Sequence, residues 1–139
     1  MVPKPVSLIF RLSMTILSIS CIIGLLALVL TKALAANPPV VITMLDTPPS
    51  FQPARIVIKA GGTVEWKNIG GEVHHATDDP SLAINKADVA KPPGAKPFDS
   101  GFLKPGETFS QTFSTPGVYR YTCAVHEMKG MNAEIIVQK

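Results

Sequence analysis

Residues 107–131 read ETFSQTFSTPGVYRYTCAVHEMKGM, and two parts of this stretch have the periodicity of β-strands. In 107–113 phenylalanines alternate with polar residues, and in 117–123 both tyrosines and Cys123 recur at every second position. Residues that alternate in this way share one face of a strand, because successive side chains point to opposite sides. The stretch therefore predicts two amphipathic strands, separated by a Pro-Gly turn, the second of which ends at a cysteine.

Further segments of the same kind lie on either side of this stretch. They are VVITM (40–44), PARIVIKAGGTVEW (53–66) and NAEIIVQ (132–138). Each is rich in β-branched or aromatic residues and is bounded by glycine, proline or polar residues, which is typical of strands. Because no convincing helical stretch interrupts them, we expect an all-β fold, a single antiparallel β-sandwich.

One long segment, 78–98, does not follow the strand pattern. It reads DDPSLAINKADVAKPPGAKPF, which is polar and contains several prolines. It has room for one short helix around 81–90, and we expect the Asp78-Asp79 pair to be a solvated loop start. A loop of this length in a compact domain is usually functional or mobile.

The N-terminal part differs in kind from the rest of the chain. The stretch 12–30 carries no charge, follows a positively charged start and precedes the A-x-A motif of 33–35. These features predict a signal peptide over residues 1–35 and a mature domain over 36–139. The apolar run is also nearly long enough to span a bilayer, so an uncleaved anchor through residues 10–30 is the alternative. Both predict an exported protein, in the periplasm or the thylakoid lumen.

The charge of the domain differs from that of the whole chain. The formal net charge of +3 is carried entirely by lysine and arginine residues that precede Ala36. The domain is therefore near neutral, and it has no basic run or basic-aromatic interleaving. This composition argues against a nucleic-acid partner.

The residues from 123 to 131, CAVHEMKGM, combine three side chains that bind soft metals. Cys123, His126 and Met131 have the spacing C-x2-H-x4-M, on the loop between the last two strands. A further histidine, His74 or His75, is available from EVHHATDD. A thiolate, two imidazoles and a thioether are the ligand set of a trigonal copper site with a weak axial methionine.

Each ligand type has a chemical reason in such a site. A thiolate donates strongly to copper, imidazole suits both oxidation states, and a thioether favours Cu(I). A copper ligand would also explain Cys123, which is the only cysteine after the leader and so has no disulfide partner in an oxidising compartment. Successive strand residues point to opposite faces, so we expect only one of His74 and His75 to bind the ion.

These residues resemble the cupredoxins, in particular the plastocyanin, amicyanin and pseudoazurin group. The resemblance covers almost all of 40–138 and rests on FQPARIVIKAGGTVEWKN, HHATDD and FDSGFLKPGETFSQTFSTPGVYRYTCAVHEMKGM. It implies a Greek-key β-sandwich that binds one type 1 copper ion. The implied function is single-electron transfer between redox partners, with no catalysed reaction.

The resemblance also implies a ligand set. In that family the first histidine ligand lies eight residues after the aromatic of the W-x-N strand, which here is His74. The implied copper ligands are His74, Cys123, His126 and Met131, with His126 at the surface as the route by which the electron enters and leaves.

Three positions depart from the plastocyanin pattern. His75 stands where plastocyanin usually has asparagine, Thr122 replaces the tyrosine before the ligand cysteine, and Val125 replaces the common proline. No acidic cluster comparable with plastocyanin's is present. The copper ligands are intact, but these differences weaken the case for a photosystem partner.

We expect the domain to be a monomer that meets redox proteins transiently, as small electron-transfer interfaces do. An apolar rim formed by Val125, Met128 and the Gly70-Gly71 turn is the hypothetical docking patch. Met128 is interpreted as a rim residue rather than a ligand.

Three other functions compete with this interpretation. A periplasmic copper carrier or storage protein would favour Met-rich tracts, which are lacking here. A copper enzyme acting on nitrite or oxygen would need additional copper ligands, and only His75 is spare. A structural zinc site is disfavoured because zinc is bound by Cys, His and carboxylates rather than by methionine.

Overall fold

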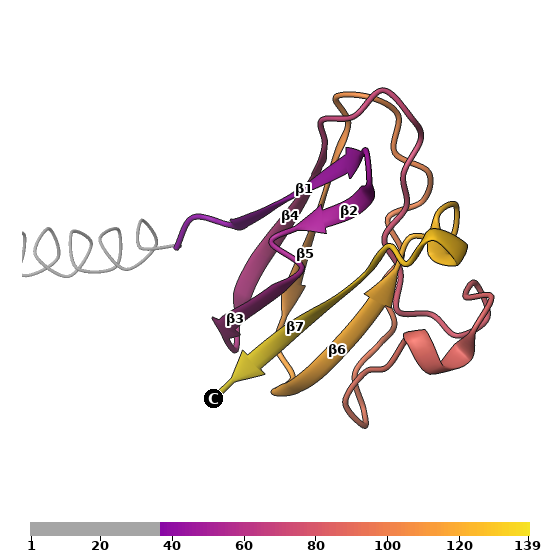
Figure 1. The fold of residues 1–139 in the computed structure, drawn as a ribbon. Helices are drawn as coiled ribbons and strands as arrows, with labels where there is room; N and C mark the ends of the chain where they lie inside the picture. The colour runs from indigo at the N-terminus through magenta and orange to yellow at the C-terminus, as the bar shows by residue number, and fades with distance from the viewer. Residues whose placement is uncertain (1–36) are drawn as a thin grey trace, which may run out of the picture. The chain divides into compact units, whose positions relative to one another are not determined.

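Seven strands form two sheets in the computed structural model, which describes residues 37–139 (Figure 1). The strands are β1 (Val40–Asp46), β2 (Pro49–Gln52), β3 (Arg55–Lys59), β4 (Gly62–Asn68), β5 (Thr108–Phe113), β6 (Gly117–Thr122) and β7 (Asn132–Gln138). One sheet has the order β2-β1-β4-β5 and the other the order β3-β7-β6. The predicted signal peptide or anchor, residues 1–35, lies outside the described residues. Among residues 37–139, no helix is long and apolar enough to span a bilayer.

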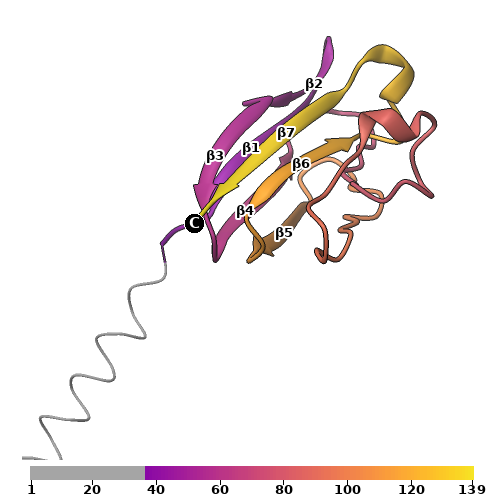
Figure 2. The same ribbon diagram turned by 90° about the horizontal axis from the view of Figure 1, so that it is seen from below.

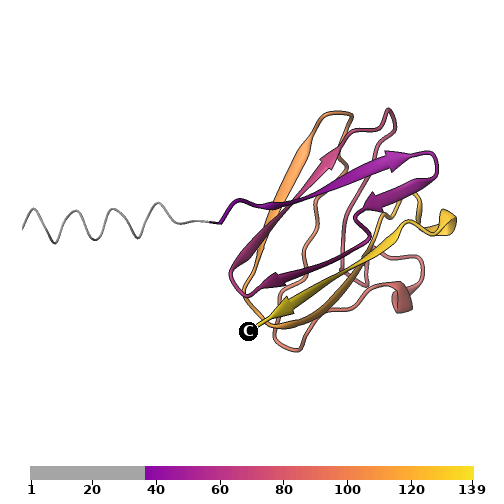
Figure 3. The ribbon, with the colours of Figure 1, turned by 60° about the vertical axis from the view of Figure 1, so that its left-hand side comes forward.

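The two sheets are mixed, so the expectation of a purely antiparallel sandwich was wrong at two strand pairs. β1 pairs parallel with β4, and β3 pairs parallel with β7. The chain crosses between the sheets after β2 and again after β3, which brings β4 back beside β1 in the same direction (Figure 3). Alternating hydrophobicity specifies which face of a strand is buried, but it does not specify the direction of the neighbouring strand.

The two sheets lie against each other (Figure 2). The buried core residues come from the inward faces of both sheets, as the alternation predicts. Trp66 of β4 is the centre of the core: its ring lies 5.0 Å from the ring of Phe98 and 5.5 Å from that of Tyr121. Both tyrosines of β6 are buried, and the hydroxyl of Tyr119 donates to the carbonyl of Thr115. Burial of each large apolar side chain contributes roughly 1.5–3 kcal/mol to folding.

Segment 78–98 contains only a single turn of 3-10 helix, η1 (Lys86–Asp88), which is shorter than the helix expected over 81–90. Prolines near both ends of the segment oppose a longer helix, because proline has no backbone N–H to donate to a helical hydrogen bond. The expected solvation of Asp78 was wrong. Its side chain is buried, and its Oδ1 accepts the backbone N–H of Phe98 at 2.7 Å.

Candidate metal centre

Cys123 follows the last residue of β6 and is fully buried. The next residues form a tight loop containing the 3-10 turn η2 (Glu127–Lys129), which ends at Gly130 with a φ of 79°. This left-handed conformation favours glycine, because a side chain would be strained there. The backbone N–H of Cys123 donates to the carbonyl of Met131 at 3.0 Å. The loop therefore closes on itself and returns Met131 to the cysteine.

Three predicted ligands meet at one point. His74 Nδ1 lies 3.9 Å from the Sγ of Cys123, and His126 Nδ1 lies 3.6 Å from the same sulfur. All three donor atoms lie within 4.8 Å of one another and all three residues are buried. His74 is fixed to the loop before β5 by a pair of backbone hydrogen bonds with Leu103. This arrangement of one sulfur and two imidazole nitrogens suits a soft transition-metal ion such as copper.

The methionines of the ligand loop have different environments. Met131 is 1% exposed and belongs to the hydrophobic core beside Cys123. Met128 is 82% exposed, as expected of a rim residue. Met131 is therefore the methionine available to an ion in the interior, although its role as the fourth ligand stays a prediction.

The environment of Cys123 opposes ionisation in the absence of a cation. Burial raises the pKa of its thiol, and the backbone N–H groups of His75, His126 and Val125 offset part of this rise. Those N–H groups are the donors that a thiolate would need. A bound metal cation would supply the missing positive charge and take the place of the proton.

His75 lies outside the group of donors. Its Nε2 bonds to Asp99, and its ring lies 5.2 Å from that of Phe102. The group that could hold an ion contains His74 and not His75. The structure thus places one histidine of the pair beside Cys123, as the alternation of side chains along an extended backbone predicts.

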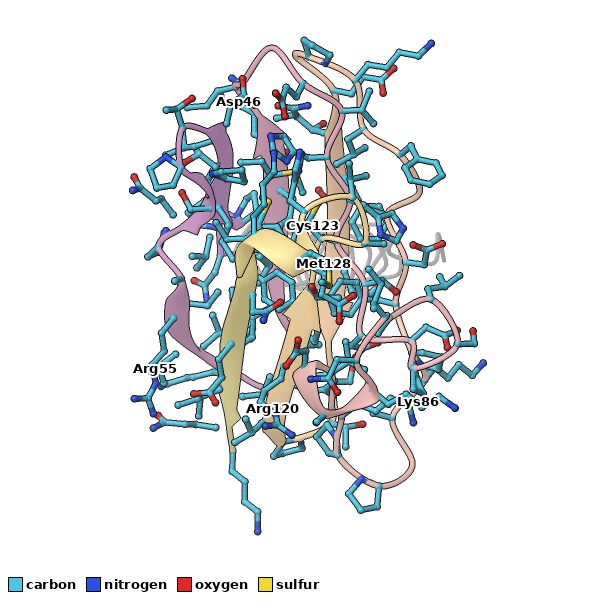
Figure 4. All side chains as sticks on the ribbon, turned by 45° about the vertical axis from the view of Figure 1, so that its right-hand side comes forward. Asp46, Arg55, Lys86, Arg120, Cys123 and Met128 are labelled. Atoms are coloured by element: carbon cyan, nitrogen blue, oxygen red, sulfur yellow. The ribbon has the colours of Figure 1, made fainter. Side chains whose placement is uncertain are left out.

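Both imidazoles of the site bond to a carboxylate through the ring nitrogen remote from the cysteine. His74 Nε2 lies 2.8 Å from Asp46 Oδ1, and His126 Nε2 lies 2.9 Å from Glu72 Oε2. An ionised carboxylate only accepts hydrogen bonds, so Nε2 of each ring is the donor in these contacts and Nδ1 is the nitrogen that a metal ion would bind. Figure 4 shows Asp46 and Cys123 in the upper half of the view, and Arg55 and Arg120 in the lower half.

Asp46 is enclosed by the loop that follows β4. Its carboxylate accepts the backbone N–H of Gly71 and, at 3.4 Å, that of Glu72. The Gly71 N–H, followed by the His74 imidazole, holds the pKa of Asp46 below its ordinary value. A Cβ at Gly70 would overlap the Asp46 carboxylate, so the close approach of this loop requires glycine there.

The expectation that His126 lies at the surface was wrong. The residue is 4% exposed, because Glu72 covers the edge of its ring and is itself half exposed. The two residues are separated by 54 positions in the chain. No local spacing links them, so a reading of the ligand loop alone could not find this contact.

The family model for copper binding proteins of the plastocyanin/azurin family matches residues 40–138. The chain belongs to this family of cupredoxins. It is 35% identical over 88 residues to the plastocyanin of Scenedesmus fuscus, covering 63% of this chain and 86% of that protein.

Among solved structures, the cupredoxin domain is similar to part of a copper-containing nitrite reductase from Thermus scotoductus. The TM-score is 0.58 and the identity 29%, over 73% of this chain and 23% of the enzyme. Reduced amicyanin shares the fold, with a TM-score of 0.56 and 21% identity over 76% of this chain and 88% of amicyanin. The protein is a copper-binding cupredoxin, and its group of His74, Cys123 and His126 fits a type 1 copper site.

Proposed function

We propose that this cupredoxin carries single electrons between redox proteins and catalyses no reaction itself. The observation that carries the proposal is the buried group of one cysteine sulfur and two imidazole nitrogens within 4.8 Å of one another. His74, Cys123 and His126 would hold one copper ion, with Met131 as a fourth, weaker ligand. Bound copper supplies a one-electron Cu(II)/Cu(I) couple. Electron-carrying relatives and the predicted leader support an exported location, in the periplasm or the thylakoid lumen.

The ligands come from rigid elements, which suits a site that changes charge without rearranging. Cys123 follows β6, an edge strand whose inward residues belong to the core. Backbone hydrogen bonds fix His74 to Leu103 and Cys123 to Met131. Burial keeps water away from the donors. Little reorganisation is then needed when the electron arrives, because the protein holds the ligands in place in both states.

Electrons would enter and leave through His126, which at 4% is the most exposed of the three grouped donor residues. Val125 and Met128 flank it in the ligand loop and are 46% and 82% exposed. Exposed Ile69 and Phe102 lie next to loops that contact the site. The apolar rim predicted from the sequence consists of Val125, Met128 and the Gly70-Gly71 turn, which Ile69 directly precedes. We propose this rim as the docking patch for redox partners during short encounters. We expect the protein to remain a monomer between encounters.

A copper carrier is the competing function, and the burial of the donors argues against it. A carrier must release its ion readily to another protein, whereas all three donors of this group are inaccessible to solvent or nearly so. Slow release of copper to a chelator would support electron transfer, and release within seconds would support a carrier.

An optical titration tests the proposed function. Metal-free protein is titrated with Cu(II), with Cys123→Ser as the control. We expect an intense visible thiolate-to-copper band at one equivalent, which is absent in the control and is bleached reversibly by ascorbate. A colourless or non-stoichiometric titration would contradict the proposal.

A further inference from the structure

The two imidazoles of the copper site share a feature that the proposed ligand set does not require. Each has its Nε2 on a carboxylate from another part of the chain: His74 on Asp46 at 2.8 Å, and His126 on Glu72 at 2.9 Å. Asp46 ends β1, and Glu72 lies in the loop after β4. Each of the two imidazoles in the site therefore has a carboxylate partner that is not itself one of the predicted ligands.

The two carboxylates belong to one hydrogen-bonded assembly. Asp46 accepts the backbone N–H groups of Gly71 and Glu72, so it holds the loop that carries the second carboxylate. The buried side chain of Asn68 donates to the carbonyls of Glu72 and Leu103, and its Oδ1 accepts the N–H of Gly70. Leu103 is the backbone partner of His74. The position of Glu72 is thus fixed relative to both histidines.

We propose that Asp46 and Glu72 are positioning residues that hold His74 and His126 as strong Nδ1 donors and so lower the reduction potential of the copper centre. The inference rests on the proposed function. A carboxylate that accepts the Nε2–H increases the electron density on the other ring nitrogen and fixes the orientation of the ring. A stronger donor and a nearby negative charge stabilise Cu(II) more than Cu(I).

The electron balance of the step is simple. A reduced partner protein would lose one electron, and a copper ion held by His74, Cys123 and His126 would gain it. The Nε2–H stays on each imidazole, hydrogen-bonded to its carboxylate, and no bond within the chain breaks. Because each ring remains attached to a fixed acceptor, both histidines keep their orientation in the reduced protein.

The third histidine provides a matched control. His75 also has its Nε2 on a carboxylate, that of Asp99, but it is not in the group of donors. Replacement of Asp99 by asparagine removes the same charge from the same kind of pair without altering a ligand. Asp46→Asn and Glu72→Gln are the test variants. Glu72 is half exposed, so its variant tests the proposal even if Asp46→Asn fails to fold.

Two measurements on the whole protein test the inference. In metal-free protein, 15N NMR of the imidazoles should show His74 and His126 protonated on Nε2. In copper-loaded protein, the reduction potential should rise in both test variants. We expect the ratio of Cu(I) to Cu(II) affinity to increase about tenfold for each, equivalent to about 59 mV for one electron, and Asp99→Asn to produce less than half that rise.

The possible results separate this inference from the proposed function. A missing blue band in wild-type protein would count against the proposed function, whereas the NMR result does not depend on copper. If the blue band forms but both test variants keep the wild-type potential, the inference is wrong. An equal rise in Asp99→Asn would also overturn it, because the effect would then be that of any nearby charge. Protonation of either ligand histidine on Nδ1 instead of Nε2 in the metal-free protein would also show that the inference is wrong.

Discussion

Glu127 Oε2 accepts a hydrogen bond from the backbone N–H of Ile84 at 2.7 Å, across 43 positions of the chain. The other oxygen of the same carboxylate accepts the N–H of Asn85 at 2.8 Å. Glu127 is buried and immediately follows the predicted ligand His126. One carboxylate therefore ties the long segment 78–98 to the ligand loop, which gives that segment a structural role that its composition did not indicate.

Replacement of Glu127 by alanine should destabilise the protein by about 2 kcal/mol or more, because two backbone donors lose a charged acceptor. Urea unfolding of the metal-free protein measures this effect. Glu107→Ala is the matched control: its carboxylate also accepts a backbone N–H, that of Lys104, but at an exposed position. Equal loss of stability in the two variants would show that the buried connection has no special importance.

Asp78 should make the stability of the protein fall as the pH rises. Burial raises the pKa of its carboxyl from 3.8 to about 6. A group whose pKa is higher in the folded state contributes stability fully below its unfolded pKa, and the contribution is lost as the pH rises through the folded pKa. The free energy of unfolding of the wild-type protein should fall by about 2–3 kcal/mol between pH 4 and 7 because of Asp78.

Asp78→Asn removes this titration while keeping the shape of the side chain, so its stability should depend less on pH over the same range. Asp79→Asn is the control, because the pKa of Asp79 is lowered by its hydrogen bonds to Ser81 and it is not buried. Thermal unfolding of metal-free protein at several pH values gives the comparison. If wild type and Asp78→Asn show the same pH dependence of stability, that dependence does not come from Asp78.

Gly70→Ala should weaken copper binding, whereas Gly71→Ala should have little effect. A Cβ at Gly70 would overlap the Asp46 carboxylate, but one at Gly71 would lie 3.6 Å from it, an ordinary contact. Displacement of Asp46 would remove the acceptor of His74, and loss of such a partner typically costs 10–100-fold in metal affinity. Competition with a copper chelator measures the affinity. Similar affinities for the two variants would show that the position of Asp46 does not matter.

Met128→Lys should slow electron exchange between two molecules of this protein at low salt, because each encounter would bring two introduced charges together at the rim. Val57→Lys is the control, since Val57 is 55% exposed on β3, away from the ligand loop. NMR line broadening in mixtures of oxidised and reduced protein gives the exchange rate. Equal slowing by both variants would argue against docking through the apolar rim.

The features that sequence reasoning found are those encoded over short distances in the chain. Alternation identified the buried face of β6, and the spacing from 123 to 131 identified a loop that closes on Cys123. In each case the residues that determine the feature lie within one strand or one tight loop.

The features that it missed depend on residues far apart in the chain. The carboxylates of Asp46 and Glu72 reach the histidines only after the strands have crossed between sheets. Burial of Asp78 follows from the pairing of its loop with the end of β6, which polar composition does not reveal. An acidic residue in a loop looks the same in sequence whether it faces solvent or an imidazole.

Voltammetry of the copper-loaded protein tests the central claim, one-electron transfer at the site of Cys123, most directly. We predict one reversible wave that transfers one electron per copper ion, keeps its shape over repeated cycles, and is absent in Cys123→Ser. An irreversible wave, loss of copper on reduction, or an unchanged wave in the serine variant would contradict one-electron transfer at this site.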